Sequence, residues 1–544
     1  MSNIARVMLD TARHHPERVA MIARHDSSWR QHTFGELLDR TGAYAEFLRR
    51  EGIRPGERVM LMVRPSPEFI CLAFALFALG AVVILIDPGM GYRNLLACIG
   101  AVKPATLIAI PRAQLFSRLF RRPFASVRRR LCVGRGLGLL GVELPAQPPA
   151  AQLTVAPSQD TDLAAIIFTT GSTGPPKGVR YEQRIFNAQL AMIRDHYRIG
   201  PGQVDQPAFP LFALFSLALG ATAVIPDMDP TRPAKVNPAK FIRTINEYQV
   251  SYSFGSPAIW RVIARHCQER GLRLPSLKKV LMAGAPVPGE LISRLAAILP
   301  EEAEIHVPYG ATEALPIVSI TGREVTGETW ALTRQGQGVC LGRALPGIEL
   351  RVIAMSDGHL AGERAVTPLP PGEVGEIVVR SPVVTAAYDH NESENWLAKI
   401  PVHDILWHRM GDLGYLDESG RLWFCGRKAH RVTTRDGELY TICCEAIFNA
   451  HPLVARSALV GVGERGGQRP VLIVEPKGRV PDRERLFAEL RELAKRHRHT
   501  AGIGDFMIHE SFPVDIRHNA KIFREKLAVW AAGRLSLTQS TFGP

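Results

Sequence analysis

The chain has 544 residues, of which 46% are hydrophobic and 22% are charged, as is typical of globular proteins that fold in water. This length exceeds one ordinary hydrophobic core, so we expect two or more domains. The 66 basic and 52 acidic residues give a net charge of +14, which favours anionic ligands such as nucleotides. The 47 glycines and 40 prolines are spread along the chain, which excludes a collagen-like protein, and we find no motif for a specific nucleic acid.

The first long apolar stretch, residues 69–86, has eighteen uncharged residues and meets a crude criterion for a transmembrane segment. Gly80 divides it into a run of helix formers and a run rich in β-branched residues. We therefore predict a buried helix and a buried parallel strand here, with no membrane span. Residues 211–226 repeat the pattern, and short apolar strands follow at 250–254, 279–282 and 304–307. This alternation predicts layered α/β architecture.

Arginines are concentrated in residues 112–135, where phenylalanine, leucine and valine alternate with them. A basic amphipathic helix here would lie on a membrane, bind a partner or cover an acyl tunnel, so peripheral membrane contact is one interpretation. A solvated basic connector is the alternative. The eight cysteines show no C-x-x-C pair and no zinc spacing, and no signal peptide is visible, so we expect a reducing cytoplasm.

The most informative stretch reads TTGSTGPPKG at residues 169–178, directly after an apolar run that is typical of a buried strand. Glycines let backbone N–H groups approach an anion, hydroxyls donate further hydrogen bonds, and Lys177 adds a positive charge. This combination suits a triphosphate, although the spacing is not that of a P-loop. A surface turn rich in Gly, Ser and Thr is the alternative.

From about Gly338 short strands follow one another closely, which predicts an antiparallel barrel or distorted sheet. After Arg427 we expect a small α+β unit. The predicted fold is thus α/β, with a large N-terminal domain (1–428) made of two layered α/β subdomains and a small β-barrel-like subdomain. A small α+β domain (429–544) completes it.

Four motifs follow the phosphate loop in a fixed order: YGATE at 309–313, GDLGY at 411–415, GR at 426–427, and PVDIRHNAK ending at Lys521. In YGATE, Tyr309 suits stacking on a base, Thr312 suits a phosphate, and the Glu313 carboxylate suits Mg²⁺. Asp412 suits the ribose hydroxyls, and Arg427 suits ribose or phosphate. Each motif alone is an ordinary turn or a solvated lysine, but their joint occurrence argues against coincidence.

Together these motifs resemble those of the ANL superfamily of adenylate-forming enzymes, and the resemblance spans almost the whole chain. It implies that ATP, with Mg²⁺, and a carboxylate form an acyl-adenylate and pyrophosphate, and that the small domain rotates between two half-reactions. The implied catalytic residues are Lys521, Glu313, Thr312 and Lys177, with Glu313 also the metal ligand. The implied nucleotide-binding residues are Thr169, Thr170, Gly171, Ser172, Thr173, Gly174, Gly284, Ala285, Tyr309, Gly310, Asp412 and Arg427.

Several positions depart from the family pattern. The hinge position, usually Asp or Lys, is Ala429 and is followed by His430; Ala520 precedes the terminal lysine; and Ala213 occupies an aromatic or histidine gate position. Adenylation is still expected despite these departures, but they leave open which group accepts the acyl chain in the second step. His430 is a candidate base, and the hypothesis predicts that His430→Ala slows product release without slowing pyrophosphate release.

Within the superfamily, FTTGSTGPPKGV, MAGAPVP and HVPYGATEALPI most resemble the β-lactone synthetases of bacterial long-chain olefin biosynthesis. That resemblance implies a long-chain 2-alkyl-3-hydroxy acid, whose own hydroxyl displaces AMP to close a β-lactone. It also suggests a complex with a hydrolase-fold decarboxylase and a ketone reductase. The alternatives are a long-chain acyl-CoA synthetase and a non-catalytic ATP-binding scaffold.

Overall fold

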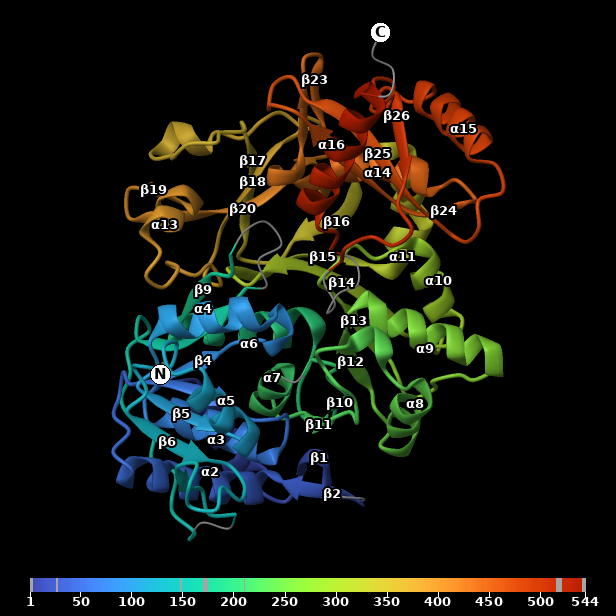
Figure 1. Ribbon diagram of the computed structural model, residues 1–544. Coiled ribbons are helices and arrows are strands. Elements are labelled where there is room, and N and C mark those ends of the chain that lie inside the picture. The colour runs from blue at the N-terminus through green and yellow to red at the C-terminus, as the bar shows by residue number, and fades with distance from the viewer. Residues whose placement is uncertain are drawn as a thin grey trace.

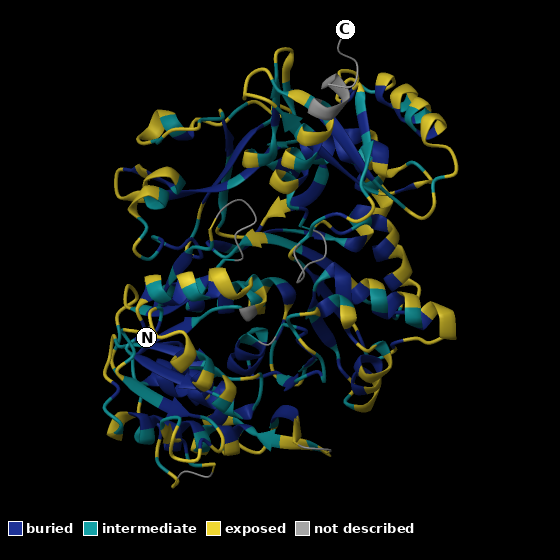
Figure 2. Cartoon of the chain, viewed as in Figure 1, coloured by how far each residue is buried: buried dark blue, intermediate teal, exposed yellow. Residues whose placement is uncertain are grey.

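The computed structural model describes residues 3–25, 28–146, 149–169, 175–209, 211–514 and 521–540 (Figure 1). Two large sheets with helices packed on them form the N-terminal part, and a smaller sheet with helices forms the C-terminal part. The buried residues follow the sheets and the inner faces of the helices, whereas the exposed residues lie on outer helix faces and loops (Figure 2).

The first sheet has seven strands in the order β7-β6-β5-β3-β4-β8-β9, and all neighbours run parallel except β8 and β9. Their bounds are β3 (Arg58–Met62), β4 (Val82–Leu85), β5 (Thr106–Ala109), β6 (Arg129–Cys132), β7 (Val142–Glu143), β8 (Leu163–Phe168) and β9 (Gly178–Glu182). Side chains that alternate along β3 enter two different cores. Val59 and Leu61 pack in one cluster with the helices α1 (Ile4–His14), α2 (Phe34–Arg50) and α3 (Pro67–Ala78), and Met60 packs in another with α4 (Tyr92–Val102).

The apolar stretch at residues 69–86 forms α3 and β4, as the sequence predicts. Ser66 caps α3 by accepting a hydrogen bond from the Phe69 N–H, Pro67 begins the helix, and Gly80 follows it with a φ of +70°. Every residue of α3 except Glu68 is buried in the protein core. Within the described part of the chain, no helix is long and apolar enough to cross a membrane. All eight cysteines are buried and unpaired.

The second sheet has fourteen strands, with β19 paired to β20 beside the main path β17-β18-β20-β21-β16-β15-β14-β13-β12-β10-β11-β1-β2. The half with the strand order β14-β13-β12-β10-β11-β1 is parallel, as predicted. Its strands are β1 (Val19–His25), β2 (Ser28–Thr33), β10 (Val204–Asp205), β11 (Thr222–Val224), β12 (Tyr252–Gly255), β13 (Lys279–Met282) and β14 (Glu304–Ala311). The helices around it are α6 (Gln183–Tyr197), α7 (Phe212–Ala218), α8 (Pro238–Glu247), α9 (Pro257–Arg270) and α10 (Gly289–Ala296).

The strands expected after Gly338 are antiparallel, as predicted, and they extend the same sheet through the pairing of β15 with β16. Their bounds are β15 (Ala314–Thr321), β16 (Val339–Ala344), β17 (Glu349–Ile353), β18 (Gly375–Arg380), β19 (Lys399–Val402), β20 (Ile405–Leu416) and β21 (Leu422–Arg427). The short helices of this region are α11 (Gly322–Glu324), α12 (Trp330–Leu332) and α13 (Glu392–Ala398).

The last part of the chain has its own sheet, β24-β25-β26, and a short hairpin of β22 and β23. The bounds are β22 (Val432–Thr434), β23 (Gly437–Leu439), α14 (Thr441–Asn449), β24 (Val454–Val462), β25 (Arg469–Pro476), α15 (Arg483–Lys495), β26 (Asp505–Ile508) and α16 (Arg524–Ser540). Two hydrophobic clusters lie wholly within residues 432–535. A separate core supports our proposal that this part is a distinct domain beginning near residue 429.

Candidate active site

The strands β8 and β9 hold the two ends of the predicted phosphate loop. The Thr169 N–H donates to the Lys177 carbonyl over 3.0 Å, and the Lys177 N–H donates to the Thr169 hydroxyl oxygen over 3.2 Å. These reciprocal bonds fix both ends of the loop at the carboxyl end of β8. Five predicted phosphate ligands, residues 170–174 (Thr170, Gly171, Ser172, Thr173 and Gly174), lie outside the described residues.

The Lys177 ammonium lies between an acidic and an aromatic side chain. Its Nζ is 2.5 Å from Glu394 Oε2 on α13 and 5.2 Å from the centre of the Tyr388 ring. An ammonium over an aromatic face is attracted by the ring, and the carboxylate balances its charge. A phosphate oxygen would compete with Glu394 for this lysine.

Glu313 is 9% exposed and follows β14 in the turn to β15. The Tyr388 hydroxyl donates to its Oε1 over 2.8 Å, and Thr385 binds its backbone carbonyl through both the N–H and the hydroxyl. Among the described residues, no group of three or more His, Cys, Asp or Glu side chains is placed to hold a metal. A lone, oriented carboxylate fits Mg²⁺, which commonly takes one or two carboxylates together with substrate phosphates and waters.

Tyr309, Asp412 and Arg427 form a hydrogen-bonded group, although they lie far apart in the sequence. The Tyr309 hydroxyl donates to Asp412 Oδ2 over 2.5 Å, and Arg427 Nη1 is 2.8 Å from Asp412 Oδ1. Asp412 and Arg427 are direct partners in the antiparallel pair β20–β21. The Asp412 carboxylate raises the pKa of Arg427, and burial raises the pKa of Tyr309 well above its ordinary value. Arg427 therefore keeps its positive charge and Tyr309 stays neutral.

A cavity of about 1260 Å³ is lined by Tyr309 from this group and continues into the apolar interior. Its lining includes Thr169, Gly284, Tyr309, Gly310, Thr312 and Lys521. Gly310 has no room for a side chain, because an added Cβ would lie 2.6 Å from the Ala314 carbonyl oxygen. Of the predicted adenine pair, Gly284 belongs to the described lining and Ala285 does not.

The rest of the lining is mainly aliphatic and aromatic, with side chains such as Phe77, Phe186 and Phe212. Asp205 is an exception. It is 1% exposed, the Ser216 hydroxyl donates to its Oδ2 over 2.5 Å, and its Oδ1 has no hydrogen-bond partner among the described residues. Burial raises the pKa of Asp205 to about 8, so its neutral form is favoured at neutral pH. A cavity of this size and composition suits a long aliphatic chain.

Lys521 reaches the cavity from the C-terminal part of the chain. An isolated antiparallel bridge between Val514 and Ile522 lies at the base of its loop. The structure thus brings Lys521 to the same cavity as Thr312 and Tyr309.

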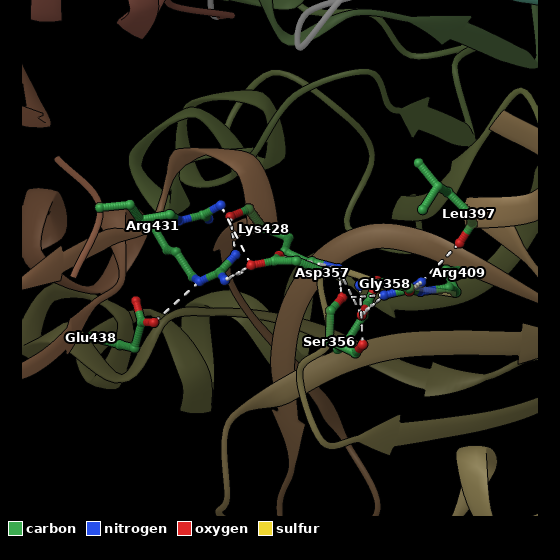
Figure 3. A network of polar contacts seen from close by, with 10 residues as sticks. Ser356, Asp357, Gly358, Leu397, Arg409, Lys428, Arg431 and Glu438 are labelled. Carbon is green, nitrogen blue, oxygen red and sulfur yellow. Dashed lines mark hydrogen bonds and ion pairs between the residues drawn. The ribbon is translucent and has the colours of Figure 1, made fainter. Parts of the chain in front are cut away.

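The connection between residues 428 and 431 is held by a polar network, which Figure 3 shows. Lys428 Nζ is 3.1 Å from Glu376 Oε2, and this carboxylate also binds Arg409 at 2.7 Å. Arg431 Nη2 is 3.0 Å from Asp357 Oδ2, and Asp357 also lies 3.6 Å from Arg465. The exposed Ala429 at the hinge position is therefore flanked on both sides by residues tied to the N-terminal part.

Two predicted acceptor-side positions do not line the cavity in the described structure. His430 packs within the C-terminal part, where its Nε2 is 3.4 Å from Glu525 Oε1 on α16. Ala213 is fully buried in α7, although its neighbours Phe212 and Leu214 belong to the cavity lining. The hypothesis that His430 is a base stays a prediction.

Sequence reasoning missed Tyr388, Glu394 and Lys399. Lys399 is buried beneath Tyr388, its Nζ is 5.9 Å from that ring, and it donates to the Thr385 carbonyl. Burial lowers its pKa to about 7, although the Glu313 carboxylate opposes this shift. These residues belong to no motif that we used, and each becomes informative only through its place around Glu313 and Lys177.

Comparison with known proteins agrees with this geometry. Residues 9–389 match the family model described as AMP-binding enzyme. An olefin beta-lactone synthetase from Xanthomonas campestris pv. campestris is 45% identical, and 98% of each chain is covered. One from Stenotrophomonas maltophilia is 44% identical with the same coverage. A long-chain-fatty-acid–CoA ligase from Thermus thermophilus is 24% identical over 84% of this chain and 83% of its own.

Solved structures share the fold. The amide bond synthetase McbA from Marinactinospora thermotolerans matches with a TM-score of 0.78 and 23% identity, over 97% of this chain and 99% of its own. O-succinylbenzoate coenzyme A synthetase from Bacillus subtilis, in complex with ATP and magnesium ion, matches with a TM-score of 0.75 and 22% identity, over 96% and 98%. The chain belongs to the AMP-binding enzymes, the adenylate-forming ANL superfamily. Its similarity to olefin beta-lactone synthetases extends over nearly its full length.

Proposed function

We propose that this enzyme activates a long-chain 2-alkyl-3-hydroxy acid with ATP and closes it to a β-lactone, releasing pyrophosphate and AMP. The assignment of a β-lactone as the product is supported by the 45% identity to an olefin beta-lactone synthetase over 98% of both chains. The cavity supports the substrate class, because it joins the nucleotide-binding residues to an apolar interior.

In the first step a carboxylate oxygen attacks the α-phosphorus of ATP, a P–O bond forms, and pyrophosphate leaves. Both partners are anionic, so positive charge and positioning are the main requirements. We assign Lys177 to the pyrophosphate side, Thr312 to the α-phosphate, and Lys521 to the carboxylate and phosphate oxygens. Mg²⁺, when bound at Glu313, supplies positive charge to the phosphate oxygens.

The remaining nucleotide contacts follow from the same assignment. Asp412 accepts hydrogen bonds from the ribose hydroxyls, with Arg427 beside it, and Tyr309 stacks on adenine next to Gly284. Thr169 and the loop after it, residues 170–174, bind phosphate.

In the second step the 3-hydroxyl oxygen of the same molecule attacks the acyl carbon. A C–O ring bond forms, the acyl–phosphate bond breaks, AMP leaves with the electron pair, and the hydroxyl proton is released. Attack within one molecule needs no thiol channel and gains from proximity. This agrees with the departures at Ala213 and Ala429.

Two further expectations belong to this proposal. We expect the reaction to take place in the cytoplasm, and we expect a complex with a hydrolase-fold decarboxylase and a ketone reductase that act on neighbouring intermediates. Co-purification of tagged protein with these enzymes tests the second expectation.

The function is tested by incubating the purified protein with ATP, Mg²⁺ and a long-chain 2-alkyl-3-hydroxy acid, with and without CoA. We expect mass spectrometry to show a β-lactone in both reactions. A thioester that forms only with CoA would instead support a long-chain acyl-CoA synthetase. The absence of AMP would support a non-catalytic ATP-binding scaffold.

A further inference from the structure

The helix α5 (Pro111–Leu119) buries its two uncharged polar side chains and leaves both of its leucines exposed. Gln114 and Ser117 are both 0% exposed, whereas Leu115 and Leu119 are 62% and 76% exposed. A surface helix normally does the reverse, with its apolar stripe against the core. Leu115 and Leu119 are four residues apart, so they lie on one outward face.

Hydrogen bonds fix α5 in this orientation. Gln114 Nε2 donates to the Leu131 carbonyl on β6 over 2.8 Å and to the Leu107 carbonyl on β5 over 3.4 Å. The Ser117 hydroxyl donates to the Gln114 carbonyl over 2.7 Å and accepts a bond from Arg130. The helix cannot roll its leucines into the core without breaking these buried bonds, so its apolar face is built to remain outside.

Other exposed apolar side chains belong to the same region of the chain. Of the fourteen large apolar side chains that are exposed in the described chain, seven lie between residues 92 and 142. Phe116 joins Tyr92 and Phe120 to the helix, with ring centres 5.8 Å and 4.7 Å away. We call the following set the α5 surface: Tyr92, Leu115, Leu119 and Phe120. Scattered exposed leucines are normal, but a cluster of this density indicates a contact surface.

The charge around the α5 surface is almost entirely positive. Residues 92–146 contain ten basic side chains and one acidic side chain, Glu143, which accepts hydrogen bonds from Gly136 and Gly138. Six of the arginines are exposed and form no ion pair with any residue that the structure describes: Arg112, Arg118, Arg121, Arg122, Arg128 and Arg135. Their charge is therefore available to an anionic surface.

We propose that the α5 surface docks onto a bilayer that contains anionic phospholipid. The leucines and aromatic rings enter the boundary between headgroups and acyl chains, and the arginines meet the lipid phosphates. An anionic bilayer fits this surface better than a protein partner does. The exposed apolar side chains lie on a segment that is basic and has a single acidic residue, and a bilayer offers both an apolar interior and negative charge. This inference goes beyond the proposed function and does not depend on it.

The helix α5 also lies beside the large cavity. Ala113 on α5 and Ile110 before it line the large cavity, so the docked face and the cavity share one helix. If the proposed function holds, a substrate dissolved in the bilayer is close to the cavity when the enzyme docks.

The test is co-sedimentation of the full chain with phosphatidylcholine vesicles, with and without phosphatidylglycerol, in the absence of any acid substrate. We expect binding to the anionic vesicles and little binding to the neutral ones, with a decrease as salt rises. Leu115→Gln/Leu119→Gln should weaken the partition coefficient about tenfold or more, because two inserting side chains become polar. Arg121→Glu/Arg122→Glu should weaken binding to anionic vesicles by a similar factor.

Matched controls separate this surface from general effects. Val529 on α16 is 76% exposed, so Val529→Gln removes an equally exposed apolar side chain elsewhere, and Arg491→Glu/Arg496→Glu makes the same charge change on the C-terminal part. Both controls should bind at least severalfold better than the corresponding α5 variants. No binding of the unaltered chain to anionic vesicles would overturn the proposal. Equal losses of binding in the α5 variants and in the controls would also overturn it. The proposal would fail as well if Leu115→Gln/Leu119→Gln abolished self-association of the chain and left vesicle binding unchanged.

Discussion

Tyr388 connects the two charged groups of the site, because its hydroxyl donates to Glu313 and its ring lies against Lys177. Nothing in its surroundings, Ala386-Ala387-Tyr388-Asp389, marks it in the sequence. The sequence predicted Lys177, Glu313, Asp412, Arg427 and Lys521 because each belongs to a motif with a known spacing. It did not predict residues that act through another side chain, since such contacts depend on how distant segments pack.

Tyr388→Phe should raise the Mg²⁺ concentration needed for half-maximal pyrophosphate release by about tenfold. The reason is that partners which orient a metal-binding carboxylate commonly affect metal affinity by this order. Titrating Mg²⁺ in a pyrophosphate-release assay measures the effect. Tyr415→Phe is the control, because the Tyr415 hydroxyl binds the Gln337 carbonyl instead. An equal fall in rate at every Mg²⁺ concentration would show that Tyr388 only supports the fold.

Asp205 makes stability depend on pH. Its folded-state pKa of about 8 exceeds the unfolded value of 3.8, so the folded chain keeps a proton that the unfolded chain loses. The stability contributed by this proton is complete below about pH 4 and is lost as pH rises to about 8, at up to about 1.4 kcal/mol per pH unit.

Asp205→Asn removes this titration while keeping the shape of the side chain. Its free energy of unfolding, measured with denaturant, should increasingly exceed that of the unaltered chain from pH 5 to pH 8. Asp39→Asn, at an exposed position on α2, should show no such divergence. A constant difference between Asp205→Asn and the unaltered chain across this range would contradict the assignment.

At the scale of elements, strong local signals predicted the fold well. The helix and strand at residues 69–86, the pair at 211–226 and the antiparallel strands after Gly338 all form as expected. The way in which β15 and β16 join the antiparallel strands to the parallel half was not predictable, since strand order between distant segments leaves no periodic pattern. The inverted face of α5 was also missed, because its nine residues read as amphipathic without showing which side is buried.

The polar network at residues 428–431 should hold the C-terminal part in the orientation seen here, with Lys521 at the cavity. We therefore expect Asp357→Asn, which removes the ion pairs to Lys428, Arg431 and Arg465, to slow adenylation severalfold. Release of lactone from preformed adenylate should be unaffected. ATP–pyrophosphate exchange and single-turnover lactone release measure the two steps separately, and Asp404→Asn serves as an exposed control. Slowing of lactone release alone would contradict this role.

At the scale of the whole molecule, the two parts of the chain meet at one cavity. The N-terminal part supplies Thr169, Tyr309 and Thr312 to its lining, and the C-terminal part supplies Lys521. The family was predictable from the sequence because its motifs span the chain. The depth of the cavity and its apolar lining required the structure, since the lining residues come from both large sheets and the helices between them.

The central claim is that the carboxylate of the substrate, and not its hydroxyl, is activated by adenylation before the ring closes. The most direct test uses a 2-alkyl-3-hydroxy acid with ¹⁸O in both carboxyl oxygens and follows the label by mass spectrometry of AMP and lactone. The account predicts one ¹⁸O in AMP and one in the lactone carbonyl, because an acyl-adenylate transfers one carboxyl oxygen to phosphate. Unlabelled AMP together with a lactone that keeps both ¹⁸O atoms would contradict it, since the hydroxyl would then have been the activated group.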